Sequence, residues 1–199
     1  MTLSLKFSFL GRFVLGLSIG CLFIGSSAIA EESAPANAST ESPAEHLLKQ
    51  LDSQDEYQRQ KAFLQLEALR DTSTAPALRQ RADSRDAQTR AWSLRALAAV
   101  EGAGAVPLLL ERMAGDNDGS VRRAALLGLE TLREQDPRIP PAMLAMLNDR
   151  NPEVRMSAMD AVSRFGTPEA AEALVARQKV EKYGDAKKVL AMALARVGR

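Results

Sequence analysis

The chain has 199 residues, of which 46% are hydrophobic and 26% charged, and its formal net charge is +1. This length suits one domain or two small ones. A nearly neutral chain has no global field that would attract nucleic acid. One histidine and one cysteine exclude a zinc site built from several such ligands.

Residues 1–30 have the pattern of a secretory signal peptide. They contain Lys6 and Arg12 but no acidic residue, and the apolar run FVLGLSIGCLFIG follows before the small residues SSAIA. This order predicts export and cleavage after Ala30, and hence a periplasmic or secreted protein. One alternative is an uncleaved membrane anchor, since residues 13–30 approach the length of a membrane span.

The only cysteine, Cys21, lies inside this leader. It could mark a lipidated N-terminus, but Ser18 stands where a lipidation signal has an aliphatic residue. A mature chain without the leader has no thiol, which is compatible with an oxidising compartment. Loss of the leader also reduces the 26 basic residues to 24, against 25 acidic residues.

Residues 31–42, EESAPANASTES, contain no large apolar side chain. Such a segment cannot bury enough surface to offset the entropy of ordering it, so a flexible linker is expected. Residues 43–199 are long enough to form a substantial core and are expected to be the folded domain.

The folded domain contains five copies of one helical pattern. Relative to a basic residue, small or apolar residues recur at offsets +3, +6, +7 and +10, which share one face at 100° per residue. The intervals between the basic residues are 31, 32, 33 and 32, and such a period indicates a solenoid. The basic positions, in chain order, are Arg59, Arg90, Arg122, Arg155 and Lys187.

A second apolar segment precedes each copy. The five are EHLLKQL, APALRQ, AVPLLLERM, PPAMLAML and TPEAAEALVA, at residues 45–51, 75–80, 105–113, 140–147 and 167–176. Proline is tolerated in the first turn of a helix because its missing N–H would be unpaired there. Each unit is therefore predicted to be two helices joined by a short turn. No segment shows sustained period-two alternation, so no sheet is expected.

Two copies match a known family pattern closely. Asp118-x-x-Val121-Arg122-x-x-Ala125 and its counterpart in NPEVRMSA, residues 151–158, resemble HEAT repeats, in particular the short form of phycobilisome lyase proteins. The resemblance covers nearly all of residues 43–199. It implies an all-α fold, a right-handed α-solenoid of about five HEAT-like helix pairs.

An acidic or amide residue lies four positions before each of the first four basic residues, where it can cap the second helix of its unit. The resemblance implies that these turn residues and the arginines hydrogen-bond and tie consecutive repeats together. The fifth unit departs from the pattern, with Tyr183 and Lys187 at these positions. The expected structural ladder is Asp55, Arg59, Asp86, Arg90, Asp118, Arg122, Asn151 and Arg155.

Offsets +1, +5 and +8 of each second helix lie opposite its packed face. The family resemblance implies that second helices face the concave side, so these offsets are the expected docking surface for a partner. The full set is Gln60, Leu64, Glu67, Ala91, Arg95, Ala98, Arg123, Leu127, Glu130, Met156, Asp160, Ser163, Lys188, Met192 and Ala195. The expected centre of partner binding is Arg95, Arg123, Leu127, Met156 and Asp160. The alternative is that these residues only fill gaps between helices.

No catalytic, cofactor-binding or metal site is predicted. His46 is the only histidine, and no Ser-His-Asp set can be built around it. Asp118-Gly119 resembles the middle of a calcium loop, but alanine occupies both of the loop's outer ligand positions. We therefore expect no enzyme and no cofactor.

The expected function is an exported non-catalytic scaffold or adaptor that binds another protein of the cell envelope. Nucleic acid is not an expected partner, and a membrane is one only if the leader is retained. The oligomeric state is left open. Two alternatives remain: a membrane-tethered assembly subunit, and a chromophore- or ligand-handling enzyme of the lyase-repeat type.

Overall fold

The computed structural model describes residues 41–198. The expected signal peptide and residues 31–40 of the expected linker lie outside these residues. The described part of the chain contains helices and turns and no strand. The α-helices are α1 (Pro43–Gln50), α2 (Glu56–Leu69), α3 (Ala75–Arg81), α4 (Ala87–Glu101), α5 (Val106–Gly115), α6 (Gly119–Thr131), α7 (Ile139–Ala145), α8 (Pro152–Val162), α9 (Pro168–Gln178) and α10 (Gly184–Val197). Short 3-10 helices cover Thr72–Thr74, Gly102–Ala105, Arg133–Gln135 and Met146–Asn148.

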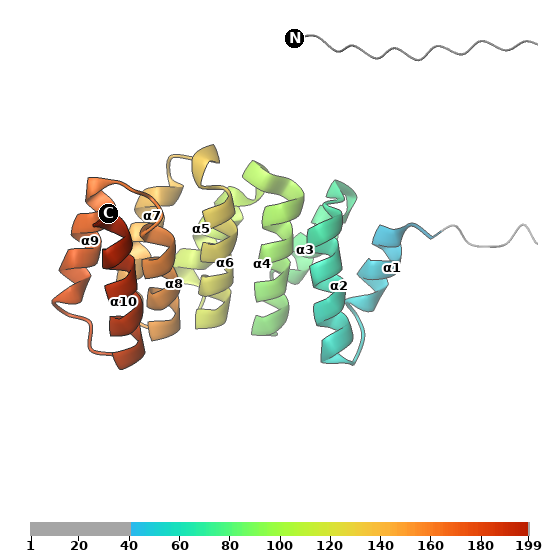
Figure 1. The fold of residues 1–199 in the computed structure, drawn as a ribbon. Helices are drawn as coiled ribbons and strands as arrows, with labels where there is room; N and C mark the ends of the chain where they lie inside the picture. The colour runs from blue at the N-terminus through green and yellow to red at the C-terminus, as the bar shows by residue number, and fades with distance from the viewer. Residues whose placement is uncertain (1–40, 199) are drawn as a thin grey trace, which may run out of the picture. The chain divides into compact units, whose positions relative to one another are not determined.

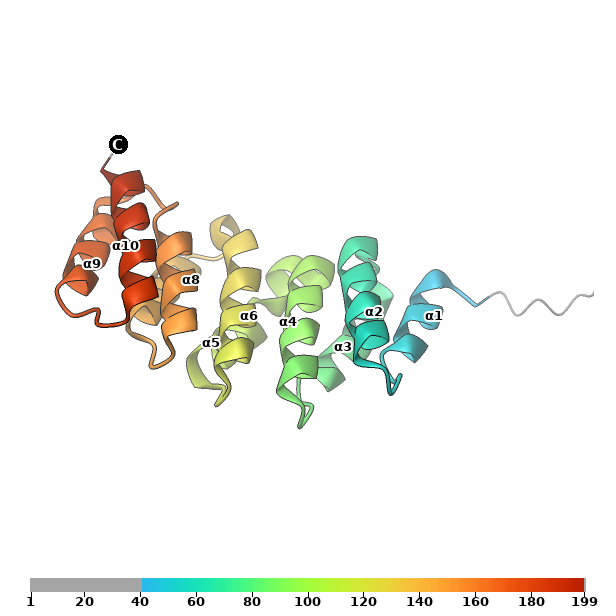
Figure 2. The ribbon, with the colours of Figure 1, turned by 60° about the horizontal axis from the view of Figure 1, so that its bottom comes forward.

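The helices form five units of two, and the units stack along one axis as an α-solenoid (Figure 1). The second helices α2, α4, α6, α8 and α10 form one row, and the first helices form the row behind it (Figures 1 and 2). Consecutive second helices pack directly against one another, whereas consecutive first helices touch little. Because the inner row of a curved stack is the more crowded one, the second helices form the inner row.

Each helix begins where its sequence provides a signal. The five first helices all carry proline in the first turn, as predicted for the last four; α1 begins at Pro43, before the segment indicated by the sequence. In the first four units, the side chain at the N-cap of the second helix accepts a backbone N–H of its first turn. These N-caps are Asp55, Asp86, Asp118 and Asn151. Tyr183 stands at the same position before α10 and makes no such bond.

Small residues let the helices approach closely in the core. Ala125 and Ala158, at offset +3 of α6 and α8, are completely buried. Gly128 of α6 faces α4 so closely that an added Cβ atom would lie 3.0 Å from Cβ of Ala98. The core therefore runs without interruption between neighbouring units.

Residues 87–115 are long and apolar enough, by length and composition, to pass as a membrane span, and half of the apolar 18-residue window within them is buried inside the fold. They comprise α4, a 3-10 turn and α5, and the chain turns at Gly102, where φ is +56°. Burial of this stretch in the solenoid accounts for its hydropathy.

Candidate functional site

An arginine of each central unit binds both its own turn and the next unit. Arg122 of α6 directs Nε and Nη2 at the two carboxylate oxygens of Asp149, both at 2.7 Å. Its Nη1 donates to the carbonyl oxygens of Asp116 and Asn117 in its own unit. The side chains of Arg122 and Asp149 are only 4% and 6% exposed. The guanidinium is thus a buried, bidentate link between two units.

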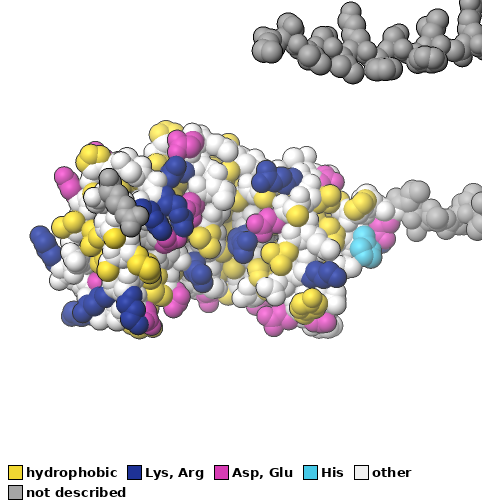
Figure 3. Space-filling view, viewed as in Figure 1, with side chains coloured by type: hydrophobic (Ala, Val, Ile, Leu, Met, Phe, Trp, Pro, Cys, Tyr) yellow, Lys and Arg dark blue, Asp and Glu magenta, His cyan; other side chains and the backbone are white. Residues whose placement is uncertain are grey.

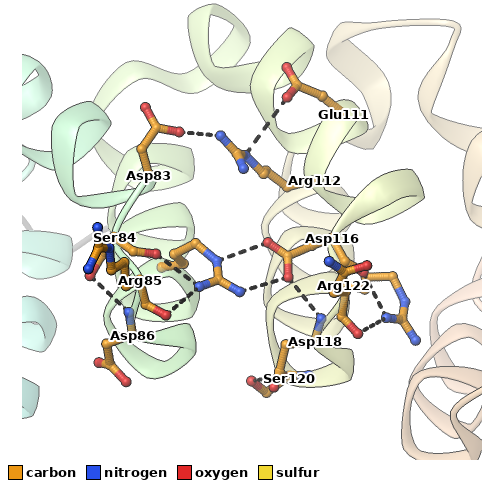
Figure 4. A network of polar contacts seen from close by, with 12 residues as sticks. Asp83, Ser84, Arg85, Asp86, Glu111, Arg112, Asp116, Asp118, Ser120 and Arg122 are labelled. Carbon is orange, nitrogen blue, oxygen red and sulfur yellow. Dashed lines mark hydrogen bonds and ion pairs between the residues drawn. The ribbon is translucent and has the colours of Figure 1, made fainter.

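The same geometry recurs in the neighbouring units. Arg90 donates to both oxygens of Asp116 at 2.9 Å, and Arg155 to both oxygens of Glu181 at 2.8 Å. Figure 4 shows one link of the series, with the Asp116 carboxylate between the guanidinium of the preceding unit and the backbone of its own turn. These three ion pairs tie the second to fifth units together, and we call them the arginine ladder.

The carboxylates of the arginine ladder are not the residues that the sequence indicated. Asp86, Asp118 and Asn151 cap their helices, and none of them hydrogen-bonds the arginine of the preceding unit. The acid lies two residues earlier, six positions before the next basic residue. Each of these carboxylates accepts the N–H of the capping residue, which turns the acid toward the preceding unit. The ladder acids missed by sequence reasoning are Asp116, Asp149 and Glu181.

The ladder stops at both ends. Arg59 donates only to the carbonyl oxygens of Ser53 and Gln54 in its own turn. The ladder position of the second unit is Ser84, whose hydroxyl accepts the Asp86 N–H but offers no carboxylate. At the other end Lys187 is exposed. The first unit is therefore attached to the second by apolar packing and exposed ion pairs, as between Arg81 and Asp52 at 2.6 Å.

Burial and charge act in opposite directions on the ladder acids. Burial is the largest single influence on the pKa of Asp116 and of Asp149 and would raise both values. Hydrogen bonds from the ladder arginines and from a backbone N–H, together with the nearby arginine charges, outweigh it and lower both pKa values. For Glu181, the hydrogen bonds from Arg155 are the largest cause, and they lower its pKa to about 2. The pKa of each of the three arginines is raised by the same bonds. All six groups are held in their charged forms.

Acid should therefore weaken the fold through Glu181. The depressed pKa stabilises the folded state fully above about pH 4.5, and the contribution is lost as the pH falls toward about 2. By pH 3 this loss should reach about 2 kcal/mol in the free energy of unfolding. Urea unfolding of the wild type and of Glu181→Gln between pH 7 and pH 3 measures it. The difference in free energy of unfolding between the wild type and Glu181→Gln should become smaller toward pH 3. The control variant Glu172→Gln, at an exposed position, should depend on pH as the wild type does. A gap that is constant with pH would contradict this assignment.

The inner row of helices is hollowed between α2, α4 and α6. A groove of about 600 Å³ has walls that include Leu64 and Arg70 and a floor that includes Gly128. A second hollow of about 240 Å³ lies between α4 and α6 and includes Trp92. Both are lined by Arg95 and Leu127, so they adjoin, and we call them together the inner groove. Hydrophobic, basic and acidic side chains are interspersed across this face (Figure 3).

Three of the five residues expected at the centre of partner binding lie in the inner groove. Arg95 and Leu127 line both hollows, and Arg123 lines the smaller one. Met156 and Asp160 line neither hollow. Met156 is half-buried against the core, and Asp160 accepts hydrogen bonds from Arg164 and Arg196. The structure therefore moves the centre of the candidate site toward the N-terminal units.

The expected docking surface also contains residues that are almost completely buried. Ala91 and Ala98 of α4 and Ser163 after α8 are buried. They were expected to face outward because a helix packed on one side leaves its opposite face free. The second helices are packed on both flanks by their neighbours in the row, and this removes Ala91 at offset +1 and Ala98 and Ser163 at offset +8 from the surface.

The inner groove is lined by more positively charged than negatively charged side chains. Arg70, Arg95 and Arg123 line it, and Glu67 is the one carboxylate among the lining residues. Glu67 lies 3.3 Å from Arg95, and both side chains are substantially exposed, so this pair contributes little to stability. Within residues 41–198, no group of three or more His, Cys, Asp or Glu side chains could hold a metal ion.

Comparison with known proteins bears on the fold of the whole described region. A family model described as HEAT repeats matches residues 44–130 and again residues 114–195. No curated protein matches the chain. The complex of CpcE and CpcF of phycocyanin lyase from Nostoc sp. PCC7120 is similar in structure, with a TM-score of 0.64 and 21% identity over 75% of this chain and 96% of that chain.

Two artificial proteins are more distant matches. An engineered protein has a TM-score of 0.47 and 19% identity, over 78% of this chain and 79% of that chain. A designed armadillo repeat protein in complex with the peptide (KR)4 has a TM-score of 0.48 and 15% identity, over 76% and 80%. The family model covers most of the chain, and the phycocyanin lyase complex has the same fold. The chain belongs to the HEAT-repeat family.

Proposed function

We propose that this protein is a non-catalytic scaffold or adaptor that binds another protein along its inner row of helices. The inner groove carries the proposal, because it combines an apolar floor with charged walls on a surface that the solenoid leaves open. Leu64 of α2 is 47% exposed at this groove, and an exposed leucine beside unbalanced arginines is typical of a binding surface.

We further propose that the protein acts in the cell envelope after export. The basis is the order of features in residues 1–30, where a basic start precedes an apolar run and a small-residue end. Cleavage after Ala30 would leave a near-neutral chain whose linker lets the solenoid reach a partner. An uncleaved leader would instead tether the same solenoid to the membrane, and the groove would serve the same purpose.

Site-specific photo-cross-linking in the cells that make the protein tests both proposals. A photoreactive residue at Leu64 should yield a protein adduct, whereas one at Glu111, exposed on α5 in the outer row, should yield none. N-terminal sequencing of the adduct from the envelope fraction should begin at Glu31. An adduct from Glu111 but not from Leu64 would refute binding at the inner row. An intact Met1, or recovery from the cytoplasm alone, would refute cleavage or export.

A further inference from the structure

The three arginines of the inner groove lack a matching set of carboxylates. Arg70 ends α2, Arg95 lies in the middle of α4, and Arg123 lies near the start of α6. Because the second helices lie side by side, these positions follow a diagonal across three neighbouring helices (Figure 1). Arg95 has Glu67, and Arg123 donates to the Ser157 hydroxyl at 2.9 Å. The groove therefore keeps an excess of positive charge at an open surface.

The backbone at Arg70 supports a role for its side chain. Its φ is +54°, and within the described residues it is the only non-glycine residue with a positive φ. This left-handed position at the end of a helix is usually filled by glycine, because a side chain there costs energy. Arg70 therefore has an unfavourable backbone conformation, and this conformation places a positively charged side chain at the end of the groove.

The floor between the arginines is apolar and shallow. Ala98 and Gly128 pack so closely that no side chain rises between α4 and α6 at that point. Leu127 and Leu132 add apolar surface beside them. Helices that pack side by side are about 8–10 Å apart, so α2 and α6 are about 16–20 Å apart. Arg70 also lies about ten positions further along its helix than Arg123 does, which adds about 15 Å along the helix axes. The diagonal is therefore about 22–25 Å long, and an extended chain covers it with about seven residues.

We propose that the inner groove binds an acidic segment of the partner protein in extended conformation. Carboxylates of the segment pair with Arg70, Arg95 and Arg123, and its small apolar side chains lie on the floor between α4 and α6. This inference rests on the proposed function and names the chemistry that the groove recognises. Charge complementarity of this kind gives specificity and fast association, and salt weakens it.

The test uses a fluorescent twelve-residue peptide of alternating glutamate and alanine, with an alternating lysine and alanine peptide as its counterpart. Fluorescence anisotropy should show binding of the acidic peptide and not of the basic one. The triple variant Arg70→Gln, Arg95→Gln, Arg123→Gln should bind the acidic peptide at least tenfold more weakly. The matched control Arg85→Gln, Lys182→Gln, Lys187→Gln removes three exposed positive charges outside the groove and should bind like the wild type. Thermal melts check that both variants fold.

Equal weakening in the two triple variants would overturn the inference, because only net charge would then matter. The inference would also be overturned if a single-stranded oligonucleotide displaced the peptide and bound more tightly at the same arginines. The outcome is separable from that of the proposed function. If Leu64 still cross-links a partner while the acidic peptide does not bind, the scaffold proposal stands and the acidic segment is refuted. If Leu64 yields no adduct, the scaffold proposal fails whatever the peptide does.

Discussion

Replacing Arg122 with alanine should lower the free energy of unfolding by about 3–5 kcal/mol, the usual cost of removing one partner of a buried ion pair. The side chain of Asp149 is 6% exposed and would keep only the Asn151 N–H as a partner. In the turn of the third unit, the carbonyl oxygen of Asp116 would lose its arginine donor, and that of Asn117 would keep only the bond from Arg150. Urea unfolding, followed by circular dichroism, measures the change.

Arg59→Ala is the matched control for this substitution. It removes an arginine from the same position of the repeat, with the same bonds to its own turn, but with no carboxylate in the next unit. The difference between the two variants therefore reports the link between units. Adding Asp149→Leu to Arg122→Met should cost less than the two single changes summed, because each alone leaves a buried charge unpaired. If Arg122→Ala costs no more than Arg59→Ala, the arginine ladder does not stabilise the stack.

The repeat and its helices could be predicted from sequence because they depend on local patterns. The period of the basic residues, the prolines in the first turns and the capping side chains are all contained within one unit. The helix pairs α5–α6 and α7–α8 accordingly lie where the apolar spacing placed them. The capping residues also behave as N-cap preferences require.

The ladder acid could not be assigned in this way because two acidic residues compete in one turn. Asp116 and Asp118 are two positions apart, and both precede Arg122. The bond from the Asp118 N–H to Asp116 decides which carboxylate faces the preceding unit. That choice depends on the path of the backbone between units. Aligning the five units at six residues before the basic position would have shown the acids Asp116, Asp149 and Glu181 in one column.

The docking surface was only partly predictable for a related reason. A helical wheel assigns one buried face and one free face, but a second helix in a solenoid has neighbours on both flanks. Leu64 and Arg95 were expected at the surface and are exposed. Ala98 was expected there too, but it is buried against Gly128 of the next unit. Whether a neighbouring helix covers a given flank depends on the distance between units, and the sequence of one repeat does not give that distance.

The close contact between α4 and α6 makes Gly128 a position where a larger side chain should strongly destabilise the fold. An added Cβ atom would lie 3.0 Å from Ala98 Cβ and 3.5 Å from a methyl group of Leu109, which is completely buried. Gly128→Leu adds three more carbons to that space, so the helices must separate or the side chain must adopt a strained rotamer. We expect a loss of about 3 kcal/mol in the free energy of unfolding, the upper part of the range for overpacked cores.

Gly115 supplies the control, because a Cβ atom added there meets nothing within 4 Å. Gly115→Leu introduces the same side chain at the exposed end of α5 and should change the free energy of unfolding by less than about 0.5 kcal/mol. The two variants also separate stability from recognition. Gly128→Leu should force α4 and α6 apart beneath the inner groove and so weaken binding of the acidic peptide even where the protein stays folded, whereas Gly115→Leu should not. Equal melting temperatures for the two variants would show that α4 and α6 are not held together as tightly as the 3.0 Å approach implies.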